Sequence, residues 1–275
     1  MRRTAAQIDA LDQVIVDVLT VDNPMTVRGV FYRVMSAGAV PKTEKAYRTV
    51  QRRVLALRRA GEIPYSHISD GTRWCRKPES WTDVDQMLDD AASSYRRAMW
   101  HDQTHHIEVW SEKDAISGVV YPITSDWDVP LMVARGFSSE TFLWNSAAEI
   151  TRIGKPAVIY QLGDHDPSGV AAWEHIKKTL TGMAPTVDFT FERIAVTEQQ
   201  IVDLQLPMRP TKATDTRSTS FAGESVEVDA IPSSVLRELV KDAITGWIDP
   251  EQLRLTEMVE AQERLVLKQL VGGAR

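Results

Sequence analysis

From residue 105 onward, apolar runs typical of strands alternate with segments that carry the apolar periodicity of helices. The expected strands cover residues 106–110, 130–134, 156–162 and 187–196. The expected helices cover residues 112–122, 139–153 and 167–181, with two more over 232–247 and 250–271. Because this alternation is typical of parallel sheets covered by helices, we predict an α/β fold with a mainly parallel sheet. Residues 197–225, which are rich in Thr, Pro and Ser, are expected to form a mobile loop.

The first 80 residues have a different pattern. Amphipathic helices are expected over 4–20, from Thr26 to Met35, and from Thr43 to Ala60, with both threonines as N-caps. Short extended pieces are expected at 63–65 and 70–74, around an Asp-Gly turn. Three helices followed by a hairpin are typical of a winged helix-turn-helix. We therefore expect a winged-helix domain over 1–80, a connector over 81–102 and an α/β domain over 103–275.

Charge divides the chain at about the same place. Residues 1–80 hold 14 Lys and Arg against 8 Asp and Glu, a balance of 14 − 8 = +6. The remainder holds 32 − 14 = 18 basic and 38 − 8 = 30 acidic residues, a balance of −12. This division favours an anion-binding module joined to a cation-binding one, although chance segregation of surface charge remains an alternative.

Composition limits the compartment. Cys75 is the single cysteine, so an intrachain disulfide and a zinc knuckle built on paired cysteines are excluded. The first residues lack the apolar stretch of a signal peptide, and no run reaches the ~18 apolar residues of a membrane span. We expect a cytoplasmic protein without membrane association.

Three acidic residues stand where expected strands give way to helices. Glu112 follows the first strand, and Asp164 and Asp166 follow the third. Sheets of this class bind ligands at the carboxyl ends of their strands. Carboxylates close together raise one another's pKa unless a cation is present, and oxygen ligands favour Mg²⁺ or Mn²⁺. The sequence therefore predicts a magnesium site, while each acid taken alone could instead cap or begin a helix.

The runs Val109–Ile116 and Tyr160–Gly169 resemble the two halves of the Toprim domain, the metal-binding fold of topoisomerases, primases and related nucleases. The resemblance implies that Glu112, Asp164 and Asp166 hold Mg²⁺ during phosphoryl transfer. The tripeptide at 135–137, with Gly136 at its centre, is similar to the glycine-bearing turn of that family.

The segment Thr26–Tyr32 resembles the part of the topoisomerase VI A subunit, and of its meiotic double-strand-break relatives, that carries the nucleophilic tyrosine. The resemblance assigns Tyr32 as the nucleophile and Arg28 as its partner. On a helical wheel Tyr32 lies roughly 130° from the centre of the apolar stripe, beside Arg28. A surface tyrosine packed on Arg28 is the alternative interpretation.

Two more groups are candidates for ligand contact. Arg48, Arg52 and Arg59 fall within roughly 40° of one another on the third helix, as expected for a row that follows a DNA backbone, or simply for solvated arginines. Glu227 and Asp229 are expected either to support the metal or to line an edge strand.

We therefore expect a magnesium-dependent DNA-breaking transesterase in which Tyr32 attacks a phosphate of double-stranded DNA. The resemblance implies a homodimer and a separate ATPase partner resembling the B subunit, since the chain lacks a G-x-x-x-x-G-K-S/T motif. A Toprim nuclease that uses water, and a non-catalytic DNA-binding protein on the same scaffold, are the alternatives.

Overall fold

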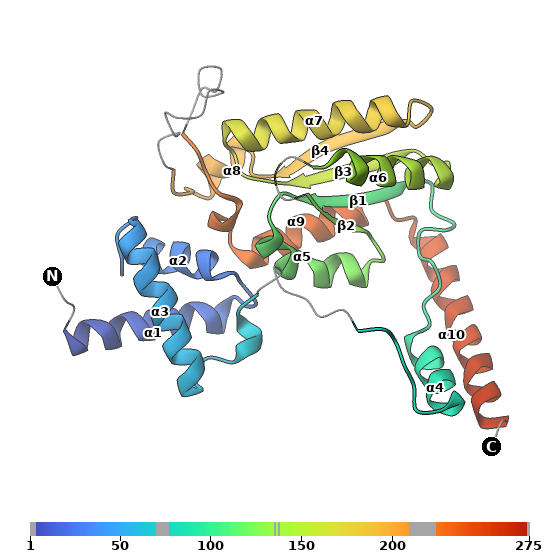
Figure 1. The fold of residues 1–275 in the computed structure, drawn as a ribbon, viewed down its shortest axis with the longest axis horizontal. Coiled ribbons are helices and arrows are strands. Elements are labelled where there is room, and N and C mark those ends of the chain that lie inside the picture. The colour runs from blue at the N-terminus through green and yellow to red at the C-terminus, as the bar shows by residue number, and fades with distance from the viewer. Residues whose placement is uncertain (1–3, 70–76, 135, 137, 209–223, 274–275) are drawn as a thin grey trace.

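The computed structural model describes residues 4–69, 77–134, 136, 138–208 and 224–273. Its centre is a helix-covered sheet, with a group of helices at either end (Figure 1). At one end lie α1 (Ala5–Val21), α2 (Val27–Ser36) and α3 (Glu44–Ala60). At the other lie α4 (Val84–Ser94) and α10 (Pro250–Gly273).

The sheet has four parallel strands in the order β2-β1-β3-β4. They are β1 (His106–Ser111), β2 (Leu131–Val133), β3 (Ala157–Leu162) and β4 (Phe189–Ala195). The predicted α/β class and its parallel sheet are thus confirmed. In the register of the two central strands Ser111 lies opposite Leu162, so β1 and β3 end at the same level.

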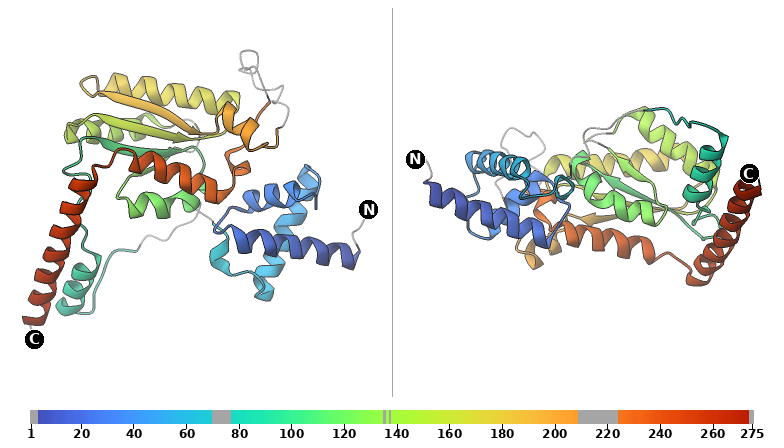
Figure 2. Two further views of the ribbon diagram at one scale, coloured as in Figure 1. Left: turned by 180° about the vertical axis from the view of Figure 1, so that it is seen from behind. Right: turned by 90° about the horizontal axis from the view of Figure 1, so that it is seen from below.

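Two pairs of helices cover the two faces of the sheet. The first pair is α5 (Asp114–Asp126) with α9 (Ser233–Thr245), and the second is α6 (Glu140–Ile153) with α7 (Pro167–Met183) (Figures 1 and 2). Side chains alternate across a strand, so Val109 packs toward α5 and α9 while Trp110 packs toward α6 and α7. Both faces of β1 and β3 are therefore buried, which explains their nearly continuous apolar runs.

The N-terminal helices begin where their caps predict. The hydroxyls of Thr26 and Thr43 accept hydrogen bonds from the backbone amides of Gly29 and Ala46, at 2.8 and 3.2 Å. The three helices bury their apolar stripes against one another, and this core continues into the α5 and α9 side of the sheet. The link is made by α2, which packs against a short 3-10 helix, η3 (Val228–Ala230).

Two local predictions fail. Residues Tyr65–His67 form a 3-10 helix instead of an extended strand, and Ile68 pairs with Met25 in an isolated parallel bridge. The other half of the expected hairpin, 70–74, lies outside the described residues. Within the expected loop at 197–225 a helix forms, α8 (Glu198–Asp203), because Thr197 and Gln200 make a capping box at its start.

The expected connector contains a helix of its own, α4, which packs against α10. The two helices lie side by side in each view and extend away from the sheet (Figures 1 and 2). No helix within the described ranges combines the length and the apolar character needed to cross a membrane.

Candidate functional site at the carboxyl edge of the sheet

The order of the strands creates a crevice at the carboxyl ends of β1 and β3. The chain leaves β1 toward β2 on one side and later returns to place β3 on the other side. The connecting helices α5 and α6 consequently cover opposite faces, and ligands bind at such a switch point in open α/β sheets. Glu112 directly follows β1, and its backbone amide donates to the carbonyl of Leu162 at 2.9 Å.

The Glu112 carboxylate lies against the loop that follows β3. Its Oε2 accepts a hydrogen bond from the backbone amide of Asp164 at 3.1 Å. A Cβ added to Gly163 or Gly169 would lie 2.8 or 3.0 Å from the same oxygen. The two glycines therefore allow the carboxylate to approach the backbone this closely.

Glu112 also lines a small crevice together with Gln161 and Gly136. Gly136 has a φ of +83°, a conformation that glycine alone adopts at no steric cost. The neighbouring Arg135 and Phe137 lie outside the described residues. In the described part of the chain the Oε1 atom of Gln161 is buried without a hydrogen-bond partner, and the crevice is too small to hold a water molecule.

The carboxylate of Asp164 is buried and already paired. Its Oδ1 accepts from the backbone amide of Val228 and from the ammonium of Lys113, both at 2.9 Å. The guanidinium of Arg193, on β4, donates to the Asp164 carbonyl oxygen. Lys113 and Arg193 were not predicted from the sequence.

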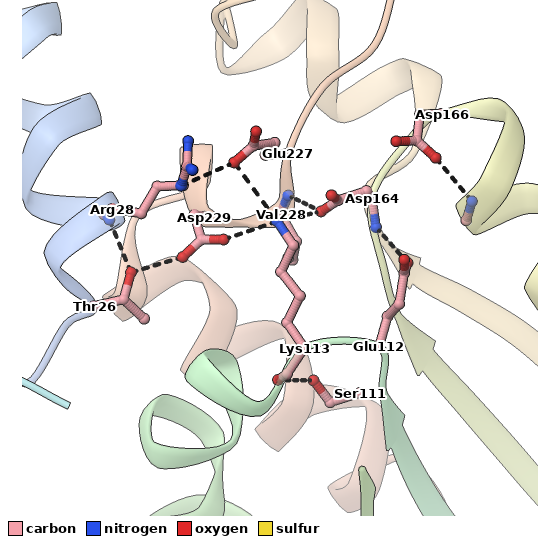
Figure 3. A network of polar contacts seen from close by, with 12 residues as sticks. Thr26, Arg28, Ser111, Glu112, Lys113, Asp164, Asp166, Glu227, Val228 and Asp229 are labelled. Atoms are coloured by element: carbon pink, nitrogen blue, oxygen red, sulfur yellow. Dashed lines mark hydrogen bonds and ion pairs between the residues drawn. The ribbon is translucent and has the colours of Figure 1, made fainter. Parts of the chain in front are cut away.

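Asp166 has a different role from Asp164. It is the N-cap of α7, where its Oδ1 accepts from the backbone amide of Gly169 at 2.8 Å, and Pro167 begins the helix. Because β3 ends at Leu162, both aspartates belong to the loop, so strand alternation does not set their directions. Two acids separated by one residue on a strand would point to the same side of the sheet, but in this loop Asp164 turns toward Lys113 and Asp166 toward α7 (Figure 3).

Lys113 is the central cation of the site. Figure 3 shows its side chain reaching from the start of α5 into a group of carboxylates. Besides Asp164, its ammonium contacts Asp229 at 3.0 Å and Glu227 at 3.6 Å. Burial disfavours the charge, but the three carboxylates outweigh it and raise the pKa of Lys113. We call Glu112, Asp164, Asp166, Glu227 and Asp229 the acidic edge.

The acidic edge is joined directly to α2. The Thr26 hydroxyl donates to Asp229 at 2.6 Å while it caps the helix. The Arg28 guanidinium contacts Glu227 at 3.4 Å. Glu227 and Asp229 flank and occupy η3, so the alternative that they line an edge strand is wrong. A chain of polar contacts therefore runs from α2 through Lys113 to the loop that holds Glu112 (Figure 3).

The structure corrects the expected exposure of Tyr32. Its side chain is 3% exposed and belongs to the core, with its ring 5.5 Å from that of Phe31. Helix α2 is covered on more than one side because η3 packs against it in addition to α1 and α3. Arg28 lies over the ring of Tyr47 at 4.7 Å, so the alternative of a surface tyrosine beneath Arg28 does not describe Tyr32 either.

The electrostatics of the acidic edge depend on these partners. Burial, and next the charges of Asp164 and Asp166, raise the pKa of Glu112. Burial also raises the pKa of Asp164, although Lys113 opposes the shift. Burial lowers the pKa of Arg193, although the negative charges of Glu112, Asp164 and Asp166 oppose this shift. Additional positive charge at this edge would therefore favour the ionised carboxylates.

The acidic edge offers the oxygen ligands that Mg²⁺ prefers, but their arrangement in the structure is not that of a metal site. Glu112 and Asp164 offer oxygen ligands, and Glu112 lines the same small crevice as Gln161. Among the described residues, however, no group of three or more His, Cys, Asp or Glu has the spacing of a metal site. Lys113 and the Val228 amide both contact the Oδ1 atom of Asp164, so an ion bound to this atom would compete with Lys113.

The predicted row of arginines on α3 is solvent-exposed. We call Arg48, Arg52 and Arg59 the arginine face. Within this face Arg48 contacts Glu44 at 3.5 Å, and the guanidinium of Arg52 donates to the Arg48 carbonyl at 3.2 Å. The opposite side of α3, including Val50 and Val54, is buried as expected.

Comparisons with known proteins assign no relative. No protein-family model matches the chain, and a search of curated proteins found no significant match. The contacts between α2 and the acidic edge are therefore the observations on which a function must be based.

Proposed function

We propose that this chain is a magnesium-dependent DNA-breaking transesterase, with a winged-helix domain and a Toprim domain as the sequence resemblance implies. The Tyr32 oxygen attacks a backbone phosphorus and forms a phosphodiester with the protein. The bond from phosphorus to one deoxyribose oxygen breaks, the phenol loses its proton, and the leaving oxygen gains one. One DNA strand end thus becomes attached to Tyr32 and the other is released as a hydroxyl.

The continuous polar connection between α2 and the acidic edge carries this proposal. Thr26 and Arg28 on the tyrosine-bearing segment contact Asp229 and Glu227, and Lys113 connects both acids to Asp164. The two sequence motifs are more than 70 residues apart in the chain, yet their side chains form one group. A shared site for a nucleophile and a phosphate-binding ion requires such proximity.

Glu112, Asp164 and Asp166 would hold Mg²⁺ or Mn²⁺. The ion would supply positive charge that positions the phosphate and stabilises charge in the transition state. Arg28 would bind the same phosphate, since a guanidinium matches phosphate geometry with two parallel hydrogen bonds. Asp164 would then leave Lys113, which remains paired with Glu227 and Asp229.

Attack by Tyr32 requires a rearrangement, because its side chain is 3% exposed. The helix that carries Tyr32, α2, packs against η3 and is joined to it through Thr26 and Arg28. DNA bound along the arginine face of α3 would lie on the same helical group as α2. We propose that binding of double-stranded DNA separates α2 from η3 and thereby uncovers Tyr32.

The proposed activity includes partners. By analogy with the resembling family, we propose that the chain acts as a homodimer. Strand passage would also need an ATPase resembling the B subunit, since this sequence has no phosphate-binding Walker motif.

The test is formation of protein-linked DNA. The full chain is incubated with end-labelled duplex DNA and Mn²⁺ or Mg²⁺, quenched with detergent and separated by denaturing electrophoresis. We expect labelled DNA that moves with the protein, and its loss in Tyr32→Phe. The control Tyr121→Phe alters a tyrosine that is 59% exposed and outside the polar network, and it should keep the product.

Each alternative is favoured by one observation. Burial of Tyr32 favours a Toprim nuclease that uses water, in which Tyr32→Phe still cuts DNA and no covalent product forms. The Lys113 contact with Asp164 favours a non-catalytic DNA-binding protein on this scaffold. In that case salt-sensitive DNA binding survives Asp164→Asn, and no divalent ion supports cutting.

A further inference from the structure

Lys113 stands at a position of α5 that does not favour a lysine. It is the N-cap residue of this helix. Residues with short polar side chains are preferred at N-caps, and the N-terminal end of a helix favours negative charge. The side chain instead extends away from the helix toward the carboxylates of the acidic edge (Figure 3). The helix alone therefore does not explain this lysine, and its distant contacts do.

The ammonium of Lys113 lies between carboxylates from two distant segments of the chain. Asp164 follows β3, and its Oδ1 is 2.9 Å from the ammonium nitrogen. Asp229 and Glu227 belong to the segment of η3, at 3.0 and 3.6 Å from the same nitrogen. One positive group thus contacts buried acids that no single element brings together. The ammonium has the place that a bound cation would take among these acids.

Lys155 shows that a similar number of contacts can have a purely structural purpose. Its ammonium, between α6 and β3, holds the segment before β1 through three backbone carbonyls at 2.7 Å, those of Trp100, His101 and Gln103. These acceptors are neutral, so they carry no charge that must be compensated. The partners of Lys113 are carboxylates, which are costly to bury without a cation. Loss of Lys113 therefore leaves a need for positive charge that loss of Lys155 does not.

The carboxylates around Lys113 retain an attraction for further positive charge. Lys113 and Arg28 supply two positive charges to three negative ones, a balance of 2 − 3 = −1. Mg²⁺ holds its oxygen ligands at about 2.0–2.1 Å, much closer than the ammonium nitrogen lies to these oxygens. An ion bound to Oδ1 of Asp164 would therefore meet the ammonium at short range, and the two cations repel one another.

We propose that Lys113 is an internal counter-cation of the acidic edge, which competes with a divalent ion for Asp164 and thereby sets the affinity of the edge for that ion. Because the ion binds Asp164 only when the ammonium has left it, the apparent dissociation constant is the intrinsic one divided by the fraction of chains in that state. Without the ion, Lys113 compensates the buried acids. The inference rests on the ion binding of the proposed function, and it is independent of any attack by Tyr32.

Isothermal titration calorimetry of the full chain with Mn²⁺ tests the competition. Lys113→Gln removes the charge and keeps a hydrogen-bond donor, so its dissociation constant should be at least about tenfold lower than that of the wild-type chain, or about 1.4 kcal/mol. Lys113→Arg keeps a cation at this place and should not gain affinity. The control Lys177→Gln removes the same charge from a surface pair with Glu174 and should bind as the wild-type chain does.

Thermal melts provide a second measurement that does not depend on a fully stable variant. Lys113→Gln should melt at a lower temperature than the wild-type chain without Mn²⁺, and saturating Mn²⁺ should restore most of the loss, because an ion that binds the folded state stabilises it. The wild-type chain should respond less. A variant that is unfolded without the ion should fold when Mn²⁺ is added, and one that stays unfolded contradicts the proposal.

The outcomes separate the counter-cation from the proposed function. Equal or weaker Mn²⁺ binding by Lys113→Gln overturns the proposal and leaves the ion of the proposed function in place. Binding by Lys113→Gln alone, with none by the wild-type chain, supports the counter-cation and contradicts the ion of the proposed function. Absence of binding in both chains overturns the proposal, while formation of protein-linked DNA tests the function separately.

Discussion

The charges of the acidic edge of the sheet are buried, whereas those of the arginine face of α3 are exposed. At the acidic edge, Asp164, Glu227 and Asp229 are at most 7% exposed, and a single ammonium contacts all three. On the arginine face the three arginines are exposed, and the contacts of Arg48 and Arg52 lie within their own helix.

Burial decides where charge affects the stability of this chain. In a buried group each charge depends on its partner, because removing one partner leaves the other unpaired at a low dielectric. On an exposed face water and salt replace a missing partner. The acidic edge should therefore control stability, and the arginine face should control only association with polyanions.

The largest effect is expected from Lys113→Met. The change removes the cation shared by three buried carboxylates, so the free energy of unfolding should fall by about 3 kcal/mol in urea titrations. The control Lys177→Met removes a surface pair with Glu174, and it should change stability by less than about 0.5 kcal/mol. Equal effects of the two variants would contradict the distinction between buried and exposed charge.

Two glycines of α7 should respond in opposite directions to the same substitution. Gly169→Ala places a methyl group against the Asp164 carbonyl and the Glu112 carboxylate, so it should destabilise the fold by about 2 kcal/mol. Gly182→Ala meets no atom within 4 Å and should stabilise the helix by about 0.5 kcal/mol. Thermal melts of both variants measure this contrast. A Gly169→Ala variant as stable as the wild-type chain would contradict the prediction.

A smaller difference is expected between two N-caps. Thr43→Ala removes a cap from α3 and should cost about 1 kcal/mol. Thr26→Ala removes a cap and also the hydrogen bond to buried Asp229, so it should cost about 1 kcal/mol more. If chemical denaturation gives the same loss for both, the contact between α2 and the acidic edge contributes nothing to stability.

The smallest effect on stability is expected on the arginine face. Arg48→Ala, Arg52→Ala and Arg59→Ala should each change the free energy of unfolding by less than about 0.5 kcal/mol. Each should also reduce the salt dependence of DNA binding by about 0.9 in log–log slope for every phosphate that the arginine neutralises. Arg53→Ala is the matched variant on the same helix. Because Arg53 pairs with Asp12 through two hydrogen bonds, its loss should lower the free energy of unfolding more than the loss of an arginine from the arginine face.

The sequence predicted the parts of this structure that depend on local chemistry. Thr26 and Thr43 are caps as expected, because their hydroxyls act on amides three residues away. The strands before Glu112 and Asp164 were recognisable because β1 and β3 are buried on both faces and hence continuously apolar. The position of the acidic edge at the sheet's carboxyl end followed from that alternation.

Contacts between distant segments were not predictable in the same way. A helical wheel places Tyr32 away from one apolar stripe, but it cannot show that η3, almost 200 residues later, covers the other side. The role of Lys113 was not predicted, because an isolated lysine is usually solvated. Its position directly after Glu112 nevertheless places it next to a predicted site residue. Arg193 had a similar signal, as a cation in the otherwise largely apolar strand β4.

We propose that the acidic edge binds a divalent ion, and Mn²⁺ titration of the full chain followed by electron paramagnetic resonance measures this binding. We predict saturable binding that Glu112→Gln and Asp164→Asn abolish, whereas Asp203→Asn, on exposed α8, leaves it unchanged. Absence of bound Mn²⁺ in the wild-type chain, or equal binding in all of these variants, would contradict the claim.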